Sequence, residues 1–421
     1  MCEHDDLASR ARLWGLVFNR RMLACALLGF SSGMPLYVLI QLLPAWFRTE
    51  GLSLATISSF SLLKLPYTWK FLWAPLLDRF SLPRLGRHRG WMLLAQLLLL
   101  AVVGAFAFFE PTVSTFAIAV LALLVAIFSA TQDIAVDAYR RELLPDAELG
   151  LGNSVFVNTY RIAGLIPGGL ALPLAERLPW SSVYWIVASF MLVGVIGTFL
   201  APPVSVPVQA PTRLKEAVVG PFVEFFTRED YKAALVLLLF LFFYKLGDNL
   251  ATTLITPFYI DLGFTLTEIG TVVKVSSLWS TVVGSLVGGV VIAKVGINRS
   301  LWVFGVVQMV SILGFALLSE LGRSMIALVA AVTFEYLGVG LGTAAFVAFM
   351  ARATSKHFSA TQYALFSSFV ALPGVIAGAL AGLVIEAIGY TQFFLLCTLL
   401  ALPGMLLLFK VAPWNHRMDE E

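Results

Sequence analysis

Long apolar runs are the feature that most limits what this 421-residue chain can fold into. Twelve of them reach about 20 residues or more, the length that an α-helix needs to cross the hydrocarbon core of a bilayer. Their approximate limits are 22–47, 52–77, 90–109, 113–138, 147–175, 180–201, 231–258, 266–293, 299–319, 323–350, 357–385 and 389–411. The sequence therefore predicts an all-α membrane protein with twelve transmembrane helices.

The composition supports this prediction. Apolar residues make up 59% of the chain and charged residues only 13%, with a mean hydropathy of +0.89. A soluble domain carries about 25% charged residues. The shortage of charge excludes a soluble globular enzyme, a disordered chain and a nucleic-acid-binding protein.

Cysteine and histidine are too few and too scattered to predict a metal site or a cofactor. Cys2, Cys25 and Cys397 lie far apart, and two of them fall within apolar runs. The four histidines lie in the termini or in loop-like stretches, so coupling to protons has to use carboxylates. We expect no cleavable signal peptide, because the first six residues are acidic and the first apolar run is too long.

The positions of Lys and Arg predict the orientation in the membrane. With a cytoplasmic N-terminus, the cytoplasmic loops and both tails hold 20 of the 28 Lys and Arg residues. The loops on the opposite side hold only Arg48, Arg177 and Arg323. Short cytoplasmic loops carry an excess of positive charge in membrane proteins. We therefore expect both termini and the connection at 202–230 to be cytoplasmic.

The two halves of the chain resemble each other. Gly51–Ser58 matches Gly263–Gly270 at an offset of 212 residues, and Gly164–Glu176 matches Gly374–Glu386 at an offset of 210. With six apolar runs per half, the repeats have the same orientation, which is the parallel repeat of the major facilitator architecture. The expected domains are a six-helix bundle at 1–201, a cytoplasmic linker at 202–230 and a second six-helix bundle at 231–421.

The loop after the second run is expected to act in gating on the cytoplasmic side. It contains Asp78-Arg79 and, further on, Arg87-His88-Arg89, and it resembles the cytoplasmic signature of the superfamily with extra residues inserted. We assign Asp78, Arg79 and Arg87 to this gate, together with Asp137 and Arg140 at the end of the fourth run. The alternative is that these residues only orient the protein in the membrane.

Four cations predict binding of an anionic substrate, because three of them fall near the middle of an apolar run and the fourth, Lys274, falls in the outer third of its run. An ionisable side chain at the bilayer centre costs about 2.5–3.5 kcal/mol even on insertion scales, so each indicates a function or a partner. Lys64, Arg161, Lys245 and Lys274 come from both halves of the chain, and Arg161 can bind a carboxylate with two parallel hydrogen bonds.

Internal ion pairs are the alternative for two of these cations. Lys245 can pair with Asp248 three residues later on the same helix face, and Arg161 can pair with Asp133 across helices. Lys64 and Lys274 have no acidic residue close by in sequence. Tyr67 and Tyr160, which flank Lys64 and Arg161, offer aromatic faces for a sugar, although aromatic residues in membrane helices also serve in packing.

Glu335 is the first candidate for proton coupling, followed by Asp248 and Asp133. Glu335 lies in the middle of the tenth run, in the glycine-rich segment Phe334–Gly342. A structural ion pair is the alternative for each of these three carboxylates.

Five motifs closely resemble the AmpG family of muropeptide permeases. They are Gly29–Leu36, Leu65–Arg79, Ser129–Arg140, Tyr244–Asp248 and Phe358–Leu365. The resemblance implies a bacterial inner-membrane transporter that imports N-acetylglucosaminyl-1,6-anhydro-N-acetylmuramic acid and its peptides with protons. In that family the activity serves peptidoglycan recycling and feeds β-lactamase induction.

The resemblance also implies further site residues. It adds Gln132 to the substrate-binding set and Gly29 to the functional positions, and we assign Gly29, Gly33, Gly164 and Gly168 to close helix packing. We expect a monomer with no partner other than substrate, protons and lipid.

Other functions remain open from the sequence. Related permeases carry other anionic amphiphiles, such as siderophores or acyl-CoA-like cargo. A membrane-embedded enzyme would use Asp133 and Asp137, which are four residues apart on one helix face, but no His or Cys accompanies them. We therefore expect a carrier and not an enzyme, and a signalling receptor would need an output domain that the sequence does not show.

Overall fold

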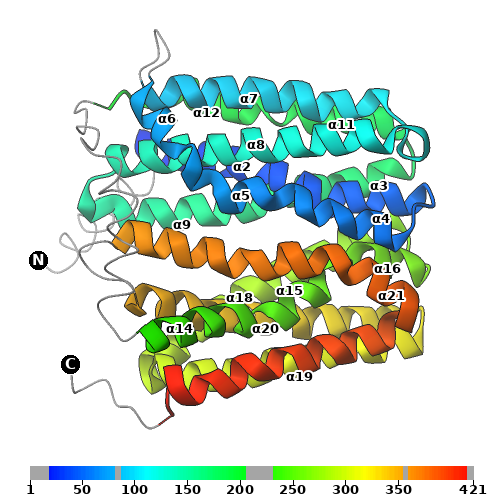
Figure 1. The fold of residues 1–421 in the computed structure, drawn as a ribbon. Helices are drawn as coiled ribbons and strands as arrows, with labels where there is room; N and C mark the ends of the chain where they lie inside the picture. The colour runs from blue at the N-terminus through cyan, green and yellow to red at the C-terminus, as the bar shows by residue number, and fades with distance from the viewer. Residues whose placement is uncertain (1–18, 81–86, 205–230, 354–358, 415–421) are drawn as a thin grey trace, which may run out of the picture. The chain divides into compact units, whose positions relative to one another are not determined.

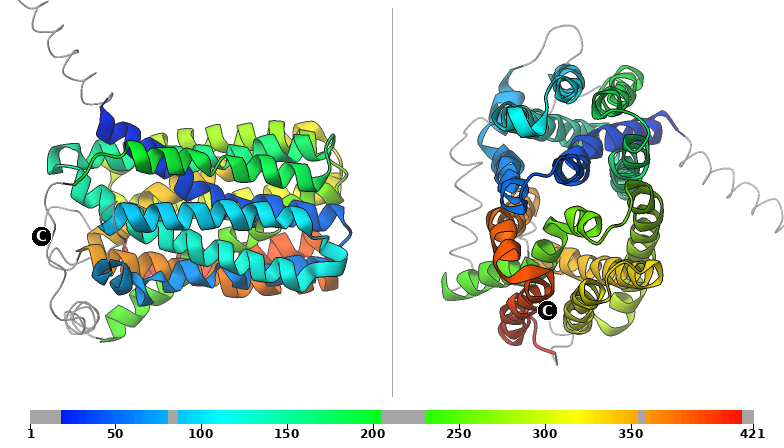
Figure 2. Two further views of the ribbon diagram at one scale, coloured as in Figure 1. Left: turned by 90° about the horizontal axis from the view of Figure 1, so that it is seen from above. Right: turned by 90° about the vertical axis from the view of Figure 1, so that its right-hand side faces the viewer.

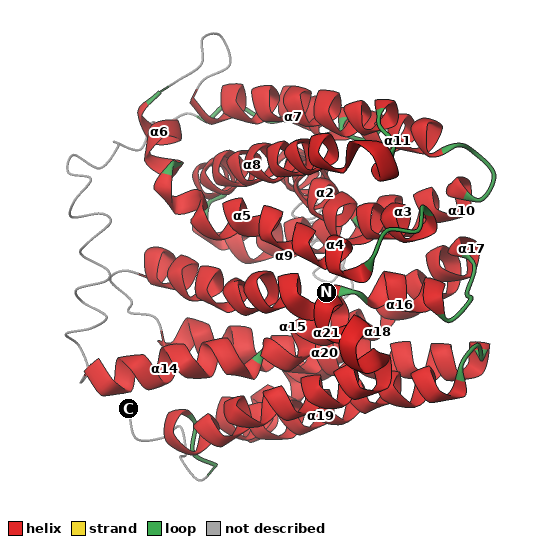
Figure 3. Ribbon diagram, turned by 45° about the vertical axis from the view of Figure 1, so that its right-hand side comes forward, coloured by secondary structure: helices red, strands yellow, loops and turns green. Residues whose placement is uncertain are grey.

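The computed structural model of the protein describes residues 19–80, 87–204, 231–353 and 359–414 (Figure 1). Every regular element in these ranges is a helix (Figure 3). Among the described residues, ten helical segments are long and apolar enough to cross a membrane. The prediction of an all-α, multi-pass membrane protein is confirmed.

The ten segments overlap eleven of the twelve predicted apolar runs. The last two runs lie in one element, α21 (Ser359–Val411), which bends at Gly389, where φ is +81°. A φ of this sign favours glycine because a side chain would meet the following carbonyl group. The bend divides α21 at the point where the sequence predicts the connection between the two runs.

The second predicted run, 52–77, is a series of short helices. They are α4 (Leu54–Ser59), η2 (Phe60–Lys64), α5 (Leu65–Trp69), η3 (Lys70–Leu72) and α6 (Ala74–Arg79). Pro66 and Pro75 lack the backbone N–H that continues an α-helix, and 3₁₀ turns precede both of them. The apolar length was therefore predicted correctly, but the helix is irregular along it.

The described helices group into two compact units. Among the described residues, the first unit comprises 19–43, 69–80 and 87–204, and the second comprises 44–68, 231–353 and 359–414. Residues 205–230 of the predicted linker lie outside the described residues. The predicted domain limits at 201 and 231 stay a prediction.

The first unit is a bundle of long helices that run side by side (Figure 1). Its main elements are α2 (Arg20–Tyr37), η1 (Val38–Leu42), α7 (Arg87–Ala105), η4 (Phe106–Phe108), α8 (Pro111–Leu143), α9 (Asp146–Ala163), η5 (Ile166–Leu170), α10 (Ala171–Ala175), α11 (Trp180–Ser189) and α12 (Leu192–Leu200). Helix α2 packs against α8, α9 and α12, and Leu28, Val136 and Phe156 belong to the core between them.

Glycine permits the close approach of α2 and α9. A Cβ atom on Gly29 would lie 2.5 Å from the carbonyl oxygen of Phe156, and one on Gly33 would overlap the carbonyl oxygen of Tyr160. A Cβ atom on Gly164 would lie 3.0 Å from the ring of Tyr37. Gly168 is buried in the π-helical turn η5. The structure thus places three of the four glycines assigned to packing where a larger side chain would collide with a neighbour.

The second unit is also a bundle, and its helices are seen end-on in the right-hand view of Figure 2. It contains part of α3 (Leu43–Thr49), then α4, α14 (Tyr231–Tyr244), α15 (Leu246–Thr253), α16 (Ile255–Asp261), α17 (Leu266–Glu268), η6 (Ile269–Val273), α18 (Lys274–Val295), α19 (Ile297–Leu321), α20 (Met325–Ala353) and α21. Helix α20 packs between α18 and α19, while α21 packs against α4, α14, α15 and α19. Phe240, Phe304 and Phe346 are buried in its core.

The predicted sequence repeat has the same local structure at both positions. Gly51 and Gly263 both have positive φ angles, of +80° and +85°. Two residues later, Ser53 caps α4 by accepting from the N–H of Thr56, and Thr265 caps α17 by accepting from the N–H of Glu268. The two halves of the chain therefore enter their second helix through the same glycine turn and N-cap.

Candidate functional site

The three membrane lysines of the second unit all lie where a helix departs from regular α geometry. Lys64 ends the 3₁₀ helix η2, and Lys274 directly follows the π-helix η6. Lys245 separates α14 from α15, with φ −104° and ψ 0°. Short 3₁₀ and π turns within a membrane helix often mark functional positions. The lysine side chains at these irregular turns are therefore candidates for a functional site.

A buried polar cluster joins α15, α19 and α20. Lys245 Nζ lies 3.1 Å from Asp248 Oδ2, and Gln308 Nε2 donates to the same oxygen at 3.3 Å. Ser311 Oγ donates to Glu335 Oε2 at 2.6 Å. We call these five residues, Lys245, Asp248, Gln308, Ser311 and Glu335, the acid cluster. Only 7% of Lys245 and 1% of Glu335 is exposed, so the charges interact away from water.

The acid cluster contains both predicted and unpredicted residues. Lys245, Asp248 and Glu335 were candidates from the sequence, which also offered the Lys245–Asp248 pair as an alternative, and this ion pair is present. Gln308 and Ser311 were missed. They are three residues apart in the otherwise apolar run 299–319, so their shared helix face was the available indication.

Lys64 and Lys274 differ from Lys245 in having no counter-ion. Within the described ranges, neither ammonium group makes an ion pair or a hydrogen bond. Lys274 is 7% exposed, and Lys64 is partly buried. A buried cation without a partner is unfavourable unless a ligand or water neutralises it. These two lysines are therefore the strongest candidates for contact with an anion.

A second carboxylate, which is partly buried, lies in the first unit. Ser32 Oγ on α2 donates a short hydrogen bond to Asp133 Oδ1 on α8. The neighbouring Gln132 is fully buried and bonds the Ser31 hydroxyl, with Nε2 at 3.2 Å and Oε1 at 3.4 Å. Gln132, predicted to bind substrate, is thus engaged with α2.

Arg161 does not pair with Asp133 in the described part of the chain, so the alternative that joined them is wrong. Arg161 lies in the last turn of α9, next to Tyr160, whose ring centroid is 6.0 Å from that of Tyr37. Tyr67 lies in α5 and is partly buried. Arg161 therefore remains available for a ligand, while Tyr160 also packs against its neighbours.

The gating candidates are only partly described. Asp137 lies 3.9 Å from Lys70 and 3.0 Å from Arg140, and the Arg140 guanidinium lies 4.0 Å from the centroid of the Phe156 ring. Asp137 is 48% exposed, so this network is open to water. The side chains of Asp78, Arg79 and Arg87 lie outside the described part of the structure.

A polar network that the sequence did not predict lies in the second unit near Gly51 and Gly263. Arg48 Nε lies 2.5 Å from Asp261 Oδ1, and the Tyr390 hydroxyl donates to Asp261 Oδ2 at 2.7 Å. Glu386 accepts from the backbone N–H of Ala55 at 2.9 Å. Arg48 and Asp261 are 213 residues apart, which is why local sequence patterns carried no indication of the pair.

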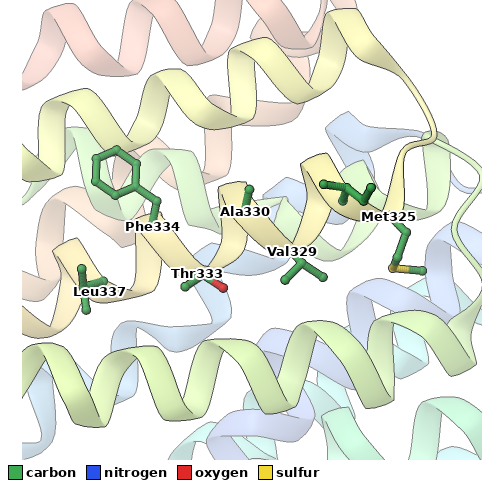
Figure 4. A pocket seen from close by; sticks show the side chains of 7 residues that line it. Met325, Val329, Ala330, Thr333, Phe334 and Leu337 are labelled. Carbon is green, nitrogen blue, oxygen red and sulfur yellow. The ribbon is translucent and has the colours of Figure 1, made fainter.

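An open groove of about 620 Å³ runs along one face of α20 (Figure 4). Its lining side chains, of which only Thr333 is polar, are Met325, Ile326, Val329, Ala330, Thr333, Phe334 and Leu337. Phe334 is 39% exposed on this side, whereas the adjacent Glu335 is 1% exposed and points to the acid cluster. An apolar groove on a membrane helix suits lipid chains, so it is not a site for an anion.

Comparison with known proteins gives one family and several relatives. The description of the Major Facilitator Superfamily matches residues 25–378. The chain is 50% identical to an "Uncharacterized protein" of Haemophilus influenzae over 413 residues, which cover 96% of this chain and 97% of that one. It is 42% identical to the "Anhydromuropeptide permease" of Escherichia coli over 384 residues, covering 91% of this chain and 78% of that one.

Solved structures of transporters share the fold. A POT family transporter in complex with 5-aminolevulinic acid aligns with a TM-score of 0.73 at 13% identity, covering 94% of this chain and 96% of that one. The nucleoside transporter NupG aligns with a TM-score of 0.70 at 16% identity, covering 94% and 100%. At such identities the likeness concerns the fold alone.

Proposed function

Since the chain belongs to the Major Facilitator Superfamily, whose members are transporters and not enzymes, we propose that it imports anhydromuropeptides into the cytoplasm together with protons. The proposed substrates are N-acetylglucosaminyl-1,6-anhydro-N-acetylmuramic acid and its peptides. The relation to the anhydromuropeptide permease of Escherichia coli, at 42% identity, supports this substrate class.

The observation that carries the proposal is the pair of lysines without counter-ions, Lys64 and Lys274. Both lie in the second unit, and neither has a partner among the described residues. The peptide portion of an anhydromuropeptide carries carboxylates, which neutralise such cations through charge-assisted hydrogen bonds. The sugar portion has apolar faces that suit aromatic residues such as Tyr67.

The proposed transport cycle uses the fold of the superfamily. The protein lies in the bacterial inner membrane as a monomer, with both termini in the cytoplasm. The substrate binds near the midplane, and the site opens alternately to the two sides of the membrane. Protons move inward with the substrate, and the acid cluster is the proposed place where they bind.

Uptake by reconstituted vesicles tests the proposal. Purified protein in liposomes with an imposed pH gradient should accumulate labelled anhydromuropeptide, and unlabelled anhydromuropeptide should compete while a siderophore and acyl-CoA should not. Competition by either of those compounds instead would assign the protein to a different anionic cargo. Vesicles that accumulate none of the three would remove the support for a carrier of this kind.

Removing the charge from each lysine, or from the carboxylates of the substrate, makes the test more specific. Lys64→Gln and Lys274→Gln should each raise the half-saturation concentration by about ten- to a hundredfold, since a hydrogen bond to a charged group is worth about 1.5–3 kcal/mol. A substrate with amidated peptide carboxylates should bind more weakly to the wild type and be insensitive to both substitutions. Lys294→Gln, at an exposed position on α18, is the matched control. Equal losses for charged and amidated substrate would contradict the assignment of these lysines.

A further inference from the structure

Two side chains of α19 hold the two carboxyl groups of the acid cluster. Gln308 Nε2 donates to Asp248 Oδ2 at 3.3 Å, and Ser311 Oγ donates to Glu335 Oε2 at 2.6 Å. Ser311 is fully buried and Gln308 is 5% exposed. Each residue therefore reaches one acid on a different helix, Asp248 on α15 and Glu335 on α20.

Glycines on α20 leave the space in which these side chains lie. A Cβ atom on Gly342 would overlap the side-chain amide of Gln308, and one on Gly338 would lie 3.1 Å from Ser311 Oγ. Glycine is used where another group has to approach the backbone this closely. The glycine-rich segment around Glu335 thus leaves room for the polar side chains of α19.

The two acids are neighbours as well. Asp248 and Glu335 lie within hydrogen-bonding reach of each other. Asp248 Oδ1 is buried and receives no hydrogen bond from the described residues. Two carboxylates cannot hydrogen-bond without a proton between them. A proton on Glu335 would supply the donor that Asp248 Oδ1 lacks.

Charge balance favours one proton at this place. Lys245 carries one positive charge, and two ionised acids would leave the cluster with a net negative charge in a buried membrane site. One bound proton makes the cluster neutral, which avoids the free energy of burying a net charge. Among the described residues, the other ionisable groups that interact electrostatically with the two acids are Tyr244, Tyr259 and Cys397. All three are neutral when protonated, so Lys245 is the cation that sets this balance.

The Ser311 hydroxyl can donate a hydrogen bond whether Glu335 is ionised or protonated. Its hydroxyl proton has two acceptors within reach, Glu335 Oε2 at 2.6 Å and the carbonyl oxygen of Gln308 at 2.8 Å. With Glu335 ionised, the hydroxyl donates to the carboxylate. With Glu335 protonated, the hydroxyl turns to the carbonyl group and no buried donor is left without an acceptor.

We propose that Gln308 and Ser311 are positioning residues that hold Asp248 and Glu335 together as a two-acid site for a single proton. The proposal rests on the proposed proton-coupled import. In each cycle the pair gains one proton from one side of the membrane and releases it to the other, with no bond to the substrate.

Transport measurements test the positioning role. Gln308→Ala and Ser311→Ala should lower uptake driven by a pH gradient by about tenfold or more, as expected for the loss of a hydrogen bond to a charged group. Counterflow exchange of the same substrate needs no net proton movement and should stay within about twofold of the wild type. A purely structural role would lower both activities together, and that result would overturn the proposal.

The close contact between Gly342 and Gln308 allows a test with a double variant. Gly342→Ala should reproduce the defect of Gln308→Ala, because the added methyl group displaces the amide. The double variant should be no worse than Gln308→Ala alone, since both changes remove the same contact. Gly314→Ala on α19 is the control, because its Cβ atom would meet Ala331 at an ordinary distance of 3.6 Å. Wild-type gradient-driven uptake by Gln308→Ala would contradict the role of this residue.

Infrared difference spectroscopy tests the two-acid site independently of the proposed substrate. Purified wild-type protein without substrate should show the carbonyl band of one buried protonated carboxyl group when the pH is lowered. Glu335→Gln should remove the band, Ser311→Ala should change its frequency, and Gly314→Ala should leave it unchanged. If the band behaves in this way while vesicles do not accumulate anhydromuropeptide, only the substrate assignment fails. A band that is absent from the wild type or unaffected by Ser311→Ala would overturn the two-acid site.

Discussion

The two units contain carboxylates in equivalent spans, the fourth and the tenth, but in different electrostatic surroundings. Asp133 and Glu335 both accept a hydrogen bond from a serine on a neighbouring helix, Ser32 and Ser311 respectively. The charged residues near Asp133 include Asp137, whose side chain is 48% exposed. Around Glu335 the nearest cation, Lys245, is itself buried.

This difference shows how each unit neutralises its acids. In the first unit, water and mobile ions reach the network of Asp137 and its cations and screen it. In the second unit, one buried lysine faces the buried Glu335 and Asp248, whose side chain is only 12% exposed, so a proton or a ligand has to complete the neutralisation. The second unit is therefore where we propose that a proton binds and leaves during transport.

The largest expected effect separates the two carboxylates. Glu335→Gln should abolish uptake driven by a pH gradient and leave counterflow exchange, because the proton site is lost while substrate binding is kept. Asp133→Asn keeps an acceptor for Ser32 and should lower the same uptake by less than about tenfold, equivalent to about 1.4 kcal/mol. Both are measured in liposomes with labelled anhydromuropeptide. Persistent gradient-driven uptake by Glu335→Gln would assign the proton to another residue.

The next effect concerns stability at the buried ion pair. Lys245→Ala leaves Asp248 buried without its cation, and we expect the free energy of unfolding to fall by about 3–5 kcal/mol. The double variant Lys245→Met/Asp248→Leu should recover most of this loss, because it removes both charges. Reversible unfolding in mixed micelles measures both, with Lys294→Ala as the exposed control. A single variant as stable as the wild type would mean that the pair is not buried as described.

Helix packing in the first unit gives a smaller effect. Gly33→Ala forces α2 away from the backbone of α9 and should lower the free energy of unfolding by about 1–3 kcal/mol. In the second unit, the Cβ atom of a residue at Gly289 would meet no atom within 4 Å. Gly289→Ala should therefore leave stability unchanged or raise it slightly, and equal losses for the two variants would contradict the close packing of α2 and α9.

The smallest effect is expected at the exposed ion pair. Asp137 and Arg140 have the same i,i+3 spacing as Lys245 and Asp248, but their pair is open to water. Asp137→Asn should lower the free energy of unfolding by less than about 1 kcal/mol. Added salt should reduce even this difference, since it screens exposed charges. A loss as large as that of Lys245→Ala would show that burial does not distinguish the two pairs.

Local features were predictable from the sequence. The apolar runs indicated the membrane helices, and the repeat identified the segments at Gly51 and Gly263, which share the same turn in the structure, because both features depend on residues close together in the chain. The Lys245–Asp248 pair was foreseen for the same reason, since residues three apart share a helix face. The irregular second run was not foreseen, although Pro66 and Pro75 were visible in it.

Contacts between distant helices were not predictable in this way. Ser32 and Asp133 are 101 residues apart, and Gln308 and Asp248 are 60 apart. The pairing of Arg161 with Asp133 was chemically reasonable, but it is not among the contacts of the described residues. The rotation of each helix about its axis decides such pairs, and that rotation follows from the packing of whole helices.

The sequence by itself determined that this chain crosses a membrane many times, and it identified the few charges within the membrane segments as candidates for a site. Hydropathy acts on each segment separately, so it can be read from the segment alone. The tertiary structure decided which charges have partners, setting Lys245 against Asp248 and leaving Lys64 and Lys274 without a counter-ion among the described residues. It also placed Gln308 and Ser311 in the space beside Gly342 and Gly338, because only close-packed helices determine where a polar side chain fits.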